Sequence, residues 1–192
     1  MKILKIFLAF IIIFSLCSCA SLTEMREVED AVLVCALGFD RSGDYIKTSM
    51  EIAFKSDKTT ILTAIGENTE ECIKKIENNV PEKLIFSHCG TVVIGQSLTH
   101  KTVSAILDYL FIKEDFPLNC YVVSADSANN LLNCKMPSNE PIGYSIAKLL
   151  SQKSQDADSR IFSLFRNEEK LLPCFKANEK TLIREEKKWK IN

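Results

Sequence analysis

A continuous apolar run near the start of the chain places the strongest constraint on its fold. Residues 31–37 read AVLVCAL, which has the length of a β-strand and the composition of one covered on both faces. The residues from Tyr45 to Phe54 alternate between apolar and polar, which predicts a second strand with one solvent-facing side. Gly38-Phe39-Asp40 and a turn at 41–44 join the two, so we expect an antiparallel hairpin that rules out an all-parallel sheet. The residues expected on the solvent-facing side are Lys47, Ser49 and Glu51.

Helix and strand patterns alternate along the rest of the chain. Asn68 and Glu71 stand at capping-box spacing, which predicts a helix from Thr69 to Asn78. Further strands are expected at Thr60–Ile65, Leu84–Phe86, Thr91–Ile94 and Cys120–Ala125, and further helices at Thr99–Phe111, at Ser127–Asn133 and around Ile146, Leu149 and Leu150. Ile161–Phe165 fits a helix, whereas Thr181–Ile191 fits either a strand or a frayed end. This interleaving predicts an α/β (α+β-like) fold, in which a mixed β-sheet is packed with helices in a single domain.

The N-terminal segment has the order of an export signal. Lys2 and Lys5 precede an apolar run from Ile6 to Leu16, which is followed by Cys17-Ser18-Cys19. A helix that spans a bilayer needs about 20 apolar residues, and this run is shorter, so we expect cleavage. The expected parts of the chain are a lipoprotein signal peptide at 1–18, a membrane-proximal tether at 19–30 and a folded domain at 31–192. The alternative is an uncleaved anchor helix from Ile6 to Leu22, whose length lies just within the tolerated range.

The end of this signal predicts a lipid attachment site at Cys19. Leu16-Cys17-Ser18-Cys19 resembles a bacterial lipobox, with Leu three places before the modified Cys and a small residue directly before it. Cys17 fits the pattern less well, because bulky Leu16 would then occupy the small-residue place. Acyl chains contribute about 0.8 kcal/mol per buried methylene, and several chains hold a protein on a membrane more firmly than one. We therefore expect the mature protein to be tethered to the membrane through Cys19.

The charge balance argues against a nucleic-acid partner. Lys plus Arg (24) nearly equals Asp plus Glu (25), so no sustained field attracts the protein to phosphate backbones. Near the C-terminus, basic residues alternate with Glu185 and Glu186, which indicates a solvated face. These basic residues are Arg184, Lys187, Lys188 and Lys190.

The cysteines of the expected domain leave two interpretations open. They are Cys35, Cys72, Cys89, Cys120, Cys134 and Cys174. An even number in an exported chain is compatible with disulfides. However, they are spread without close pairing, and Cys35, Cys72 and Cys120 lie in apolar strand or helix patterns. Buried free thiols that behave as small hydrophobic residues explain these positions more simply, and a disulfide framework is the alternative.

No motif predicts an enzyme, a metal site or a cofactor site. His88 and Cys89 are neighbours in an extended segment, so their side chains are expected on opposite faces rather than as a nucleophile and base. His100 has no metal-ligand companion at a recognised spacing, and HExxH, CxxC, P-loop and GxSxG patterns do not occur. We expect Asp40 to serve in strand-end turn chemistry. His88 is expected to be a buried hydrogen-bonding residue at the entry of the next strand, and a surface role in subunit contact is the alternative.

Four segments of the chain, together with the lipobox, match one known pattern. They read AVLVCALGFD (31–40), KLIFSHCGTVVIGQSL (83–98), AILDYL (105–110) and YVVSADSANNLL (121–132). This order resembles the N-terminal domain of the Ger(x)C spore germination lipoproteins, which are the C subunits of nutrient germinant receptors. The most specific piece is Ser87-His88, which leads into a strand that ends at Ile94-Gly95. Full-length members of that family continue through two more domains, so we expect a shortened paralogue, a gene fragment or one half of a split subunit.

The resemblance implies a non-catalytic, lipid-anchored subunit of a nutrient germinant receptor, without a cofactor. Such a subunit would lie on the outer face of the spore's inner membrane. Its implied partners are the polytopic, transporter-like B subunit and the membrane-embedded A subunit. The alternative function is a solute-binding or other cell-envelope lipoprotein that works independently of germination. A solute binder generally needs a pocket between lobes, and one domain of this size offers no obvious second lobe.

Overall fold

The computed structural model of the protein describes residues 31–54, 59–136, 139–152, 159–167, 170–178 and 181–191. The expected signal peptide, Cys19 and the tether at 19–30 lie outside the described residues. The strands are β1 (Ala31–Ser42), β2 (Tyr45–Ala53), β3 (Thr59–Gly66), β4 (Lys83–Ile85), β5 (Thr91–Gly95), β6 (Tyr121–Ala125), β7 (Lys170–Asn178) and β8 (Thr181–Ile191). The helices are α2 (Thr69–Glu77), α3 (His100–Ile112), α4 (Ala128–Leu132), α5 (Ile142–Ser151) and α6 (Ile161–Arg166).

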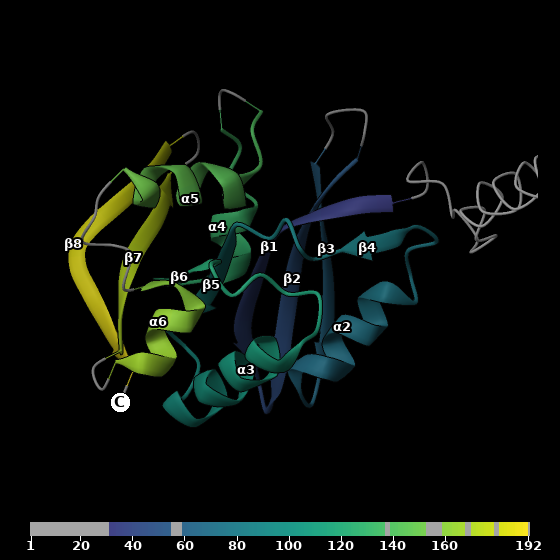
Figure 1. The fold of residues 1–192 in the computed structure, drawn as a ribbon, viewed down its shortest axis with the longest axis horizontal. Helices are drawn as coiled ribbons and strands as arrows, with labels where there is room; N and C mark the ends of the chain where they lie inside the picture. The colour runs from purple at the N-terminus through teal and green to yellow at the C-terminus, as the bar shows by residue number, and fades with distance from the viewer. Residues whose placement is uncertain are drawn as a thin grey trace, which may run out of the picture. The chain divides into compact units, whose positions relative to one another are not determined.

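The described strands form one mixed sheet in the order β3-β2-β1-β5-β6-β7-β8, and β4 also pairs with β1 (Figure 1). β1 and β2 form the expected antiparallel hairpin, and β3 continues it on the outside. β1, β5 and β6 run parallel in the middle of the sheet. β7 joins β6 through the pair Ser124↔Cys174, and the chain then turns back as antiparallel β8. The predicted α/β fold with a mixed sheet is therefore confirmed.

β1 is longer than its sequence pattern predicts. The strand expected over 31–37 continues to Ser42, so Gly38-Phe39-Asp40 lies inside the strand rather than before a turn. The turn is confined to Gly43 and Asp44, and Gly43 has a φ of 62°, a conformation that favours glycine. The extra length places Phe39 in one core of the domain and Asp40 below the helix α4.

The sequence predicts only part of the C-terminal hairpin of β7 and β8. The pattern does not predict β7, and it leaves Thr181–Ile191 open between a strand and a frayed end. The structure makes this segment β8, which pairs antiparallel with β7. The sequence pattern does not indicate a strand for β7 because it contains Pro173, and proline normally argues against an internal strand. In the structure the pairing of β7 with β8 shifts register between Pro173 and Phe175. A sheet tolerates proline at an irregularity of this kind.

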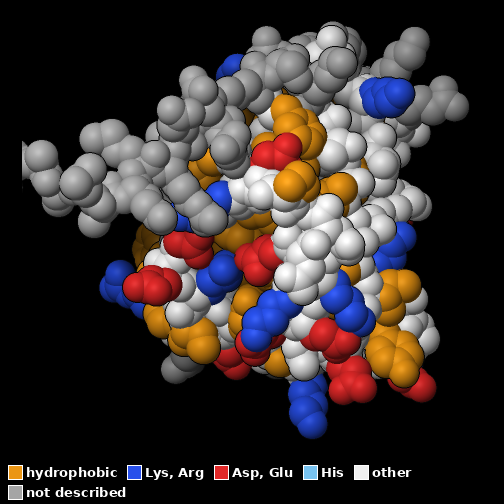
Figure 2. Space-filling model, turned by 90° about the vertical axis from the view of Figure 1, so that its right-hand side faces the viewer, with side chains coloured by type: hydrophobic (Ala, Val, Ile, Leu, Met, Phe, Trp, Pro, Cys, Tyr) orange, Lys and Arg blue, Asp and Glu red, His pale blue; other side chains and the backbone are white. Residues whose placement is uncertain are grey.

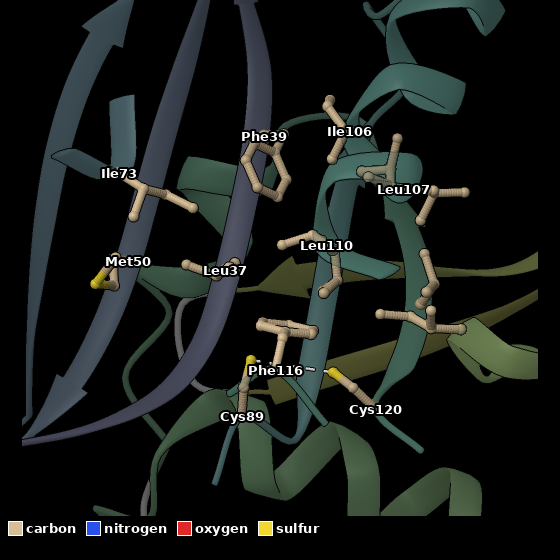
Figure 3. Close-up of a cluster of buried hydrophobic side chains, with 14 of the residues drawn as sticks. Leu37, Phe39, Met50, Ile73, Cys89, Ile106, Leu107, Leu110, Phe116 and Cys120 are labelled. Carbon is tan, nitrogen blue, oxygen red and sulfur yellow. Dashed lines mark hydrogen bonds between the residues drawn. The ribbon is translucent and has the colours of Figure 1, made fainter. Parts of the chain in front are cut away.

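The first core lies on the face of the sheet that α2, α3 and α6 cover. The apolar stripe predicted for α3 is buried, which confirms that helix and its orientation. The stripe consists of Val103, Ile106, Leu107 and Leu110. Figure 3 shows side chains of α3 together with Leu37 and Phe39 of β1 and Ile73 of α2 in this core. The N-terminal cap predicted for α2 is also confirmed, since the Asn68 side chain accepts a hydrogen bond from the Glu71 backbone N–H at 2.9 Å.

The second core lies on the opposite face, where α4 and α5 cover Ala36, Val93 and Val123. These helices cover the side of β2 that was expected to face solvent, so the prediction of a solvent-facing side is wrong. Ser49 and Glu51 are both buried. The Ser49 hydroxyl donates a hydrogen bond to the Asn129 side-chain oxygen of the α4 helix at 3.0 Å. The alternation in β2 is therefore between two covered faces, one apolar and one polar.

Candidate functional site

Two buried acidic side chains on the opening hairpin form the polar centre of the domain. Asp40 of β1 is 7 % exposed and Glu51 of β2 is 2 % exposed. Each accepts hydrogen bonds from the first backbone N–H groups of a helix, Asp40 from α4 and Glu51 from α5. A buried carboxylate is costly unless such donors surround it. The two carboxylates thus fix the helices of the second core on the sheet.

Asp40 caps the short helix α4. One of its carboxylate oxygens accepts from the Ala128 backbone N–H at 2.8 Å. The other accepts from the Asn129 N–H at 2.8 Å and from the Ser127 hydroxyl at 3.3 Å. These backbone N–H groups have no partner inside the helix, and the positive end of the helix dipole favours an anion there. The expectation that Asp40 serves strand-end turn chemistry is therefore wrong, because its partners come from a helix far along the chain.

Glu51 replaces a missing local cap at α5. The N-cap residue of this helix, Pro141, makes no side-chain capping hydrogen bond. The two Glu51 oxygens instead accept from the Ile142 and Gly143 N–H groups at 2.7 and 2.8 Å. Burial raises the pKa of Glu51 to about 7, although the two hydrogen bonds lower it. This carboxyl group consequently titrates near neutral pH.

The first turn of α5 lies so close to β1 that only glycine fits at position 143. A Cβ atom there would collide with the Cys35 carbonyl oxygen and would lie 2.8 Å from the Ala36 Cβ. The Gly143 carbonyl in turn accepts a hydrogen bond from the Thr91 hydroxyl at 2.7 Å. Cys35 lies at the irregularity between Val34 and Ala36, where β1 changes register against β2. The bulge in β1, the start of β5 and Glu51 therefore hold the same turn of α5.

A cavity of about 530 Å³ opens beside Glu51, between β3 and the segment that connects α4 to α5. Its size lies within the range of small-molecule sites. Its lining residues are Glu51, Thr59, Thr60, Ile61, Leu132, Asn133, Cys134, Lys135, Met136, Asn139, Glu140 and Ile142. The lining is mixed, with amides, hydroxyls and charges of both signs. Because both Glu51 oxygens already accept backbone N–H groups, the most buried acid of the cavity serves the fold.

The thiols of the domain are buried rather than reactive. All six described cysteines are free; Cys134 is half-buried and the other five are buried. The burial predicted for Cys35, Cys72 and Cys120 is confirmed. Burial raises the pKa of Cys35 to about 12, and it also raises the pKa of Cys72 and Cys120. Since the thiolate is the nucleophilic form, these groups react slowly at neutral pH.

The two histidines lie in different surroundings. His88 is exposed in the turn between β4 and β5, so the prediction of a buried hydrogen-bonding residue is wrong. Phe86 and Cys89 take the interior positions on either side of this turn, which confirms that His88 and Cys89 point in opposite directions. His100, at the start of α3, stacks on Trp189 of β8 with ring centroids 5.8 Å apart. Within the described ranges, no three His, Cys, Asp or Glu residues are grouped so that they could hold a metal ion.

Four apolar side chains are exposed where α3 ends beside α6, and we call them the α3–α6 patch. They are Phe111 (39 % exposed), Ile112 (79 %), Leu118 (38 %) and Phe165 (38 %). The Phe111 and Phe165 rings lie 4.3 Å apart between centroids, and the Leu118 carbonyl accepts a hydrogen bond from the Phe162 N–H at 3.1 Å. Grouped exposed apolar side chains of this kind mark contact surfaces more often than scattered ones do.

The side of the domain that carries α2 has a different character. Figure 2 shows this side, where positive and negative side chains are interspersed with hydrophobic ones. On α2 the exposed charges form two ion pairs one helical turn apart, Lys74 with Glu70 and Lys75 with Glu71, each at 2.6 Å. Exposed pairs of this type contribute little to stability and are typical of a solvated helix face. The α3–α6 patch is therefore the better candidate for a contact surface.

Comparison with known proteins places the domain in a family. A family model described as the spore germination protein N-terminal domain matches residues 24–168, from before β1 to just beyond α6. No curated protein and no solved structure matches the chain. In the part of the chain that the structure describes, no helix is long and apolar enough to cross a membrane. The match confirms the resemblance noted in the sequence and supports a role in spore germination. The chain belongs to the family of the spore germination protein N-terminal domain.

Proposed function

We propose that this chain is a non-catalytic, lipid-anchored subunit of a nutrient germinant receptor. The observation that carries the proposal is the family match over residues 24–168. The lipobox Leu16-Cys17-Ser18-Cys19 supports lipid attachment at Cys19 after removal of the signal peptide. The subunit would act on the outer face of the spore's inner membrane, beside the A and B subunits of the receptor.

The mechanism in this proposal is physical rather than chemical. A lipid on Cys19 confines the domain to the membrane and so raises its effective concentration near membrane-embedded partners. The α3–α6 patch offers these partners an apolar contact surface. Asp40 and Glu51 are engaged in holding α4 and α5, and this supports a role in binding rather than in catalysis.

The cavity beside Glu51 supports a second candidate, a solute-binding envelope lipoprotein that works independently of germination. The family match favours the receptor role over this alternative. A strain with the gene disrupted separates the two. The receptor role predicts spores that respond poorly to at least one nutrient, and it also predicts that the A and B subunits co-purify with the tagged chain after cross-linking. Spores that respond normally to every nutrient would count against the receptor role.

The anchor is tested with labelled fatty acid. A Cys19→Ala variant should take up no label and should move from the membrane to the soluble fraction. The matched control is Cys17→Ala, which removes the neighbouring thiol and should leave uptake unchanged. If label persists in Cys19→Ala and disappears in Cys17→Ala, the lipid is on Cys17. If both variants take up as much label as the wild type, neither thiol is required for lipid attachment.

A further inference from the structure

Two cysteine side chains meet in the first core where two parallel strands begin. Cys89 lies two residues before β5, and Cys120 lies directly before β6. Both are buried. Their Sγ atoms are 4.0 Å apart, and the Cys120 thiol is directed at the Cys89 sulfur (Figure 3). The same two segments are joined by a backbone hydrogen bond of 3.1 Å from the Tyr121 N–H to the Gly90 carbonyl.

The backbone at this point is compatible with a disulfide. β5 and β6 are adjacent strands, paired from Thr91↔Tyr121 onward. Continued by one residue, this register puts Gly90 opposite Cys120, so Cys89 is displaced by one residue from that position. Adjacent strands lie about 4.8 Å apart and rise about 3.3 Å per residue, so Cα atoms displaced in this way lie roughly 6 Å apart, within the 4.4–6.8 Å that a disulfide needs. The sulfur atoms must approach from 4.0 Å to a bond length of about 2.05 Å. Rotation of these short side chains about their Cα–Cβ bonds supplies a movement of that size.

We propose that Cys89 and Cys120 form a disulfide when the chain folds in an oxidising compartment. The oxidant is a small-molecule disulfide. A thiolate of one cysteine attacks a sulfur of this molecule, forms a mixed disulfide and releases one small thiol, which takes up the proton. The second cysteine then attacks the mixed disulfide and releases the second small thiol. Two protein thiols are oxidised and one small-molecule disulfide is reduced to two thiols, so protons and electrons balance.

The burial of the pair determines when the bond forms. In the folded domain the small-molecule disulfide cannot reach either sulfur, because Cys89 is 3 % exposed and Cys120 is 2 % exposed. The exchange therefore takes place while the two segments are still open during folding. After folding, the same burial protects the bond from reductants.

In the folded domain the Cys89 and Cys120 sulfurs contact each other in addition to the Thr91 and Tyr121 carbonyl oxygens, and this sulfur–sulfur contact sets the pair apart from the other described thiols. Each of them contacts an oxygen: Cys35 the Leu33 carbonyl, Cys72 the Ile46 carbonyl, Cys134 the Asn178 carbonyl and Cys174 the Ser124 hydroxyl. A bond between Cys89 and Cys120 would close a loop that contains the whole of α3. It would also tie the exposed Ser87-His88 turn to the start of β6.

Peptide mapping of the full-length chain tests the proposal. The chain is refolded in detergent with a mixture of reduced and oxidised glutathione. The product is then unfolded in guanidinium chloride that contains iodoacetamide, so that buried free thiols are also blocked, and it is digested with trypsin. We expect the tryptic peptide 84–101, which contains Cys89, to be linked to the peptide 114–135, which contains Cys120. The linked product should be two hydrogens lighter than the sum of its parts, and reduction should separate it.

Cysteine variants identify the partner, because the peptide 114–135 also contains Cys134. The link should persist in Cys134→Ser and disappear in Cys120→Ser. The melting temperature of the oxidised chain should exceed that of the reduced chain by roughly 5–10 °C in the wild type and in Cys134→Ser. It should not differ between the two states in Cys89→Ala.

Two results overturn the proposal. One is recovery of both Cys89 and Cys120 in blocked form from protein that has refolded in the oxidising mixture. The other is a link from Cys89 to Cys134. If Cys120→Ser fails to fold, the wild type and Cys134→Ser decide the question without it. None of these outcomes depends on whether the chain acts in a germinant receptor.

Discussion

Replacing Glu51 with Gln should remove a specific part of the pH dependence of stability. Burial raises the pKa of Glu51 from the ordinary value of 4.5 to about 7. Each pKa unit corresponds to about 1.4 kcal/mol. The folded protein binds this proton more tightly than the unfolded chain does. The resulting stabilisation, about 3–4 kcal/mol, is complete well below pH 4.5 and is lost as the pH rises through 7. Gln keeps the size of the side chain but has no proton to lose.

Urea unfolding of the full-length chain and its Glu51→Gln variant between pH 4.5 and 8 measures this effect. The chain has a single tryptophan, Trp189, which stacks on His100 and so gives a fluorescence signal for unfolding of the β8 and α3 region. Other titrating groups act equally in both proteins, so the difference between the two unfolding free energies isolates Glu51. The wild type should lose about 3 kcal/mol relative to the variant over this pH range. The matched control is Glu186→Gln, at an exposed position of β8, which should give parallel curves.

Two results would refute this reasoning. If the difference between wild type and Glu51→Gln is independent of pH, Glu51 has the same proton affinity in the folded and unfolded states. If the wild type instead gains stability relative to the variant as the pH rises, the two α5 N–H groups outweigh the cost of burial. The sign of the slope therefore decides which of the two opposing effects dominates at this site.

Two further predictions concern the attachment of α4 and α5. Gly143→Ala should lower the free energy of unfolding by about 1–3 kcal/mol, because the new methyl group collides with the Cys35 carbonyl and α5 must shift; urea unfolding at fixed pH measures it. Asp40→Ala should cost about 2–3 kcal/mol, since three donors at the start of α4 lose their acceptor. Ser127→Ala should cost only about 1 kcal/mol in the same assay, and equal losses for the two variants would contradict the dominant role of Asp40.

Local patterns account for the elements that the sequence predicts correctly. The apolar stripe of α3 and the Asn68 cap of α2 depend on residues within a few positions of one another, and the structure confirms both. The hairpin of β1 and β2 is visible for the same reason, because two strand patterns flank a short turn. β7 is not predicted from local patterns, because Pro173 interrupts its strand pattern. Its place in the sheet depends on pairing with β6 and β8, and β6 lies far away in the chain.

The polar centre could not be predicted from local patterns. The alternation in β2 predicts a solvent-facing side that carries Lys47, Ser49 and Glu51. In the structure this side is covered by α4 and α5, which lie about 80 to 90 residues later in the chain. Asp40 has the sequence context of a turn residue and becomes a helix cap for the same reason. His88 is exposed because Phe86 and Cys89 take the interior positions of its turn.

The amino-acid sequence by itself determined the mixed α/β class, most strands and helices, the family likeness and the burial of several thiols. These features follow from periodicity and short-range hydrogen bonding, which act along neighbouring residues. Only the tertiary structure decided that Asp40 and Glu51 hold two helices, that Gly143 lies against Cys35 and that Cys89 meets Cys120. The physical reason is that burial and hydrogen-bond partners depend on which layers of the fold pack together, and residues far apart in the chain supply those layers.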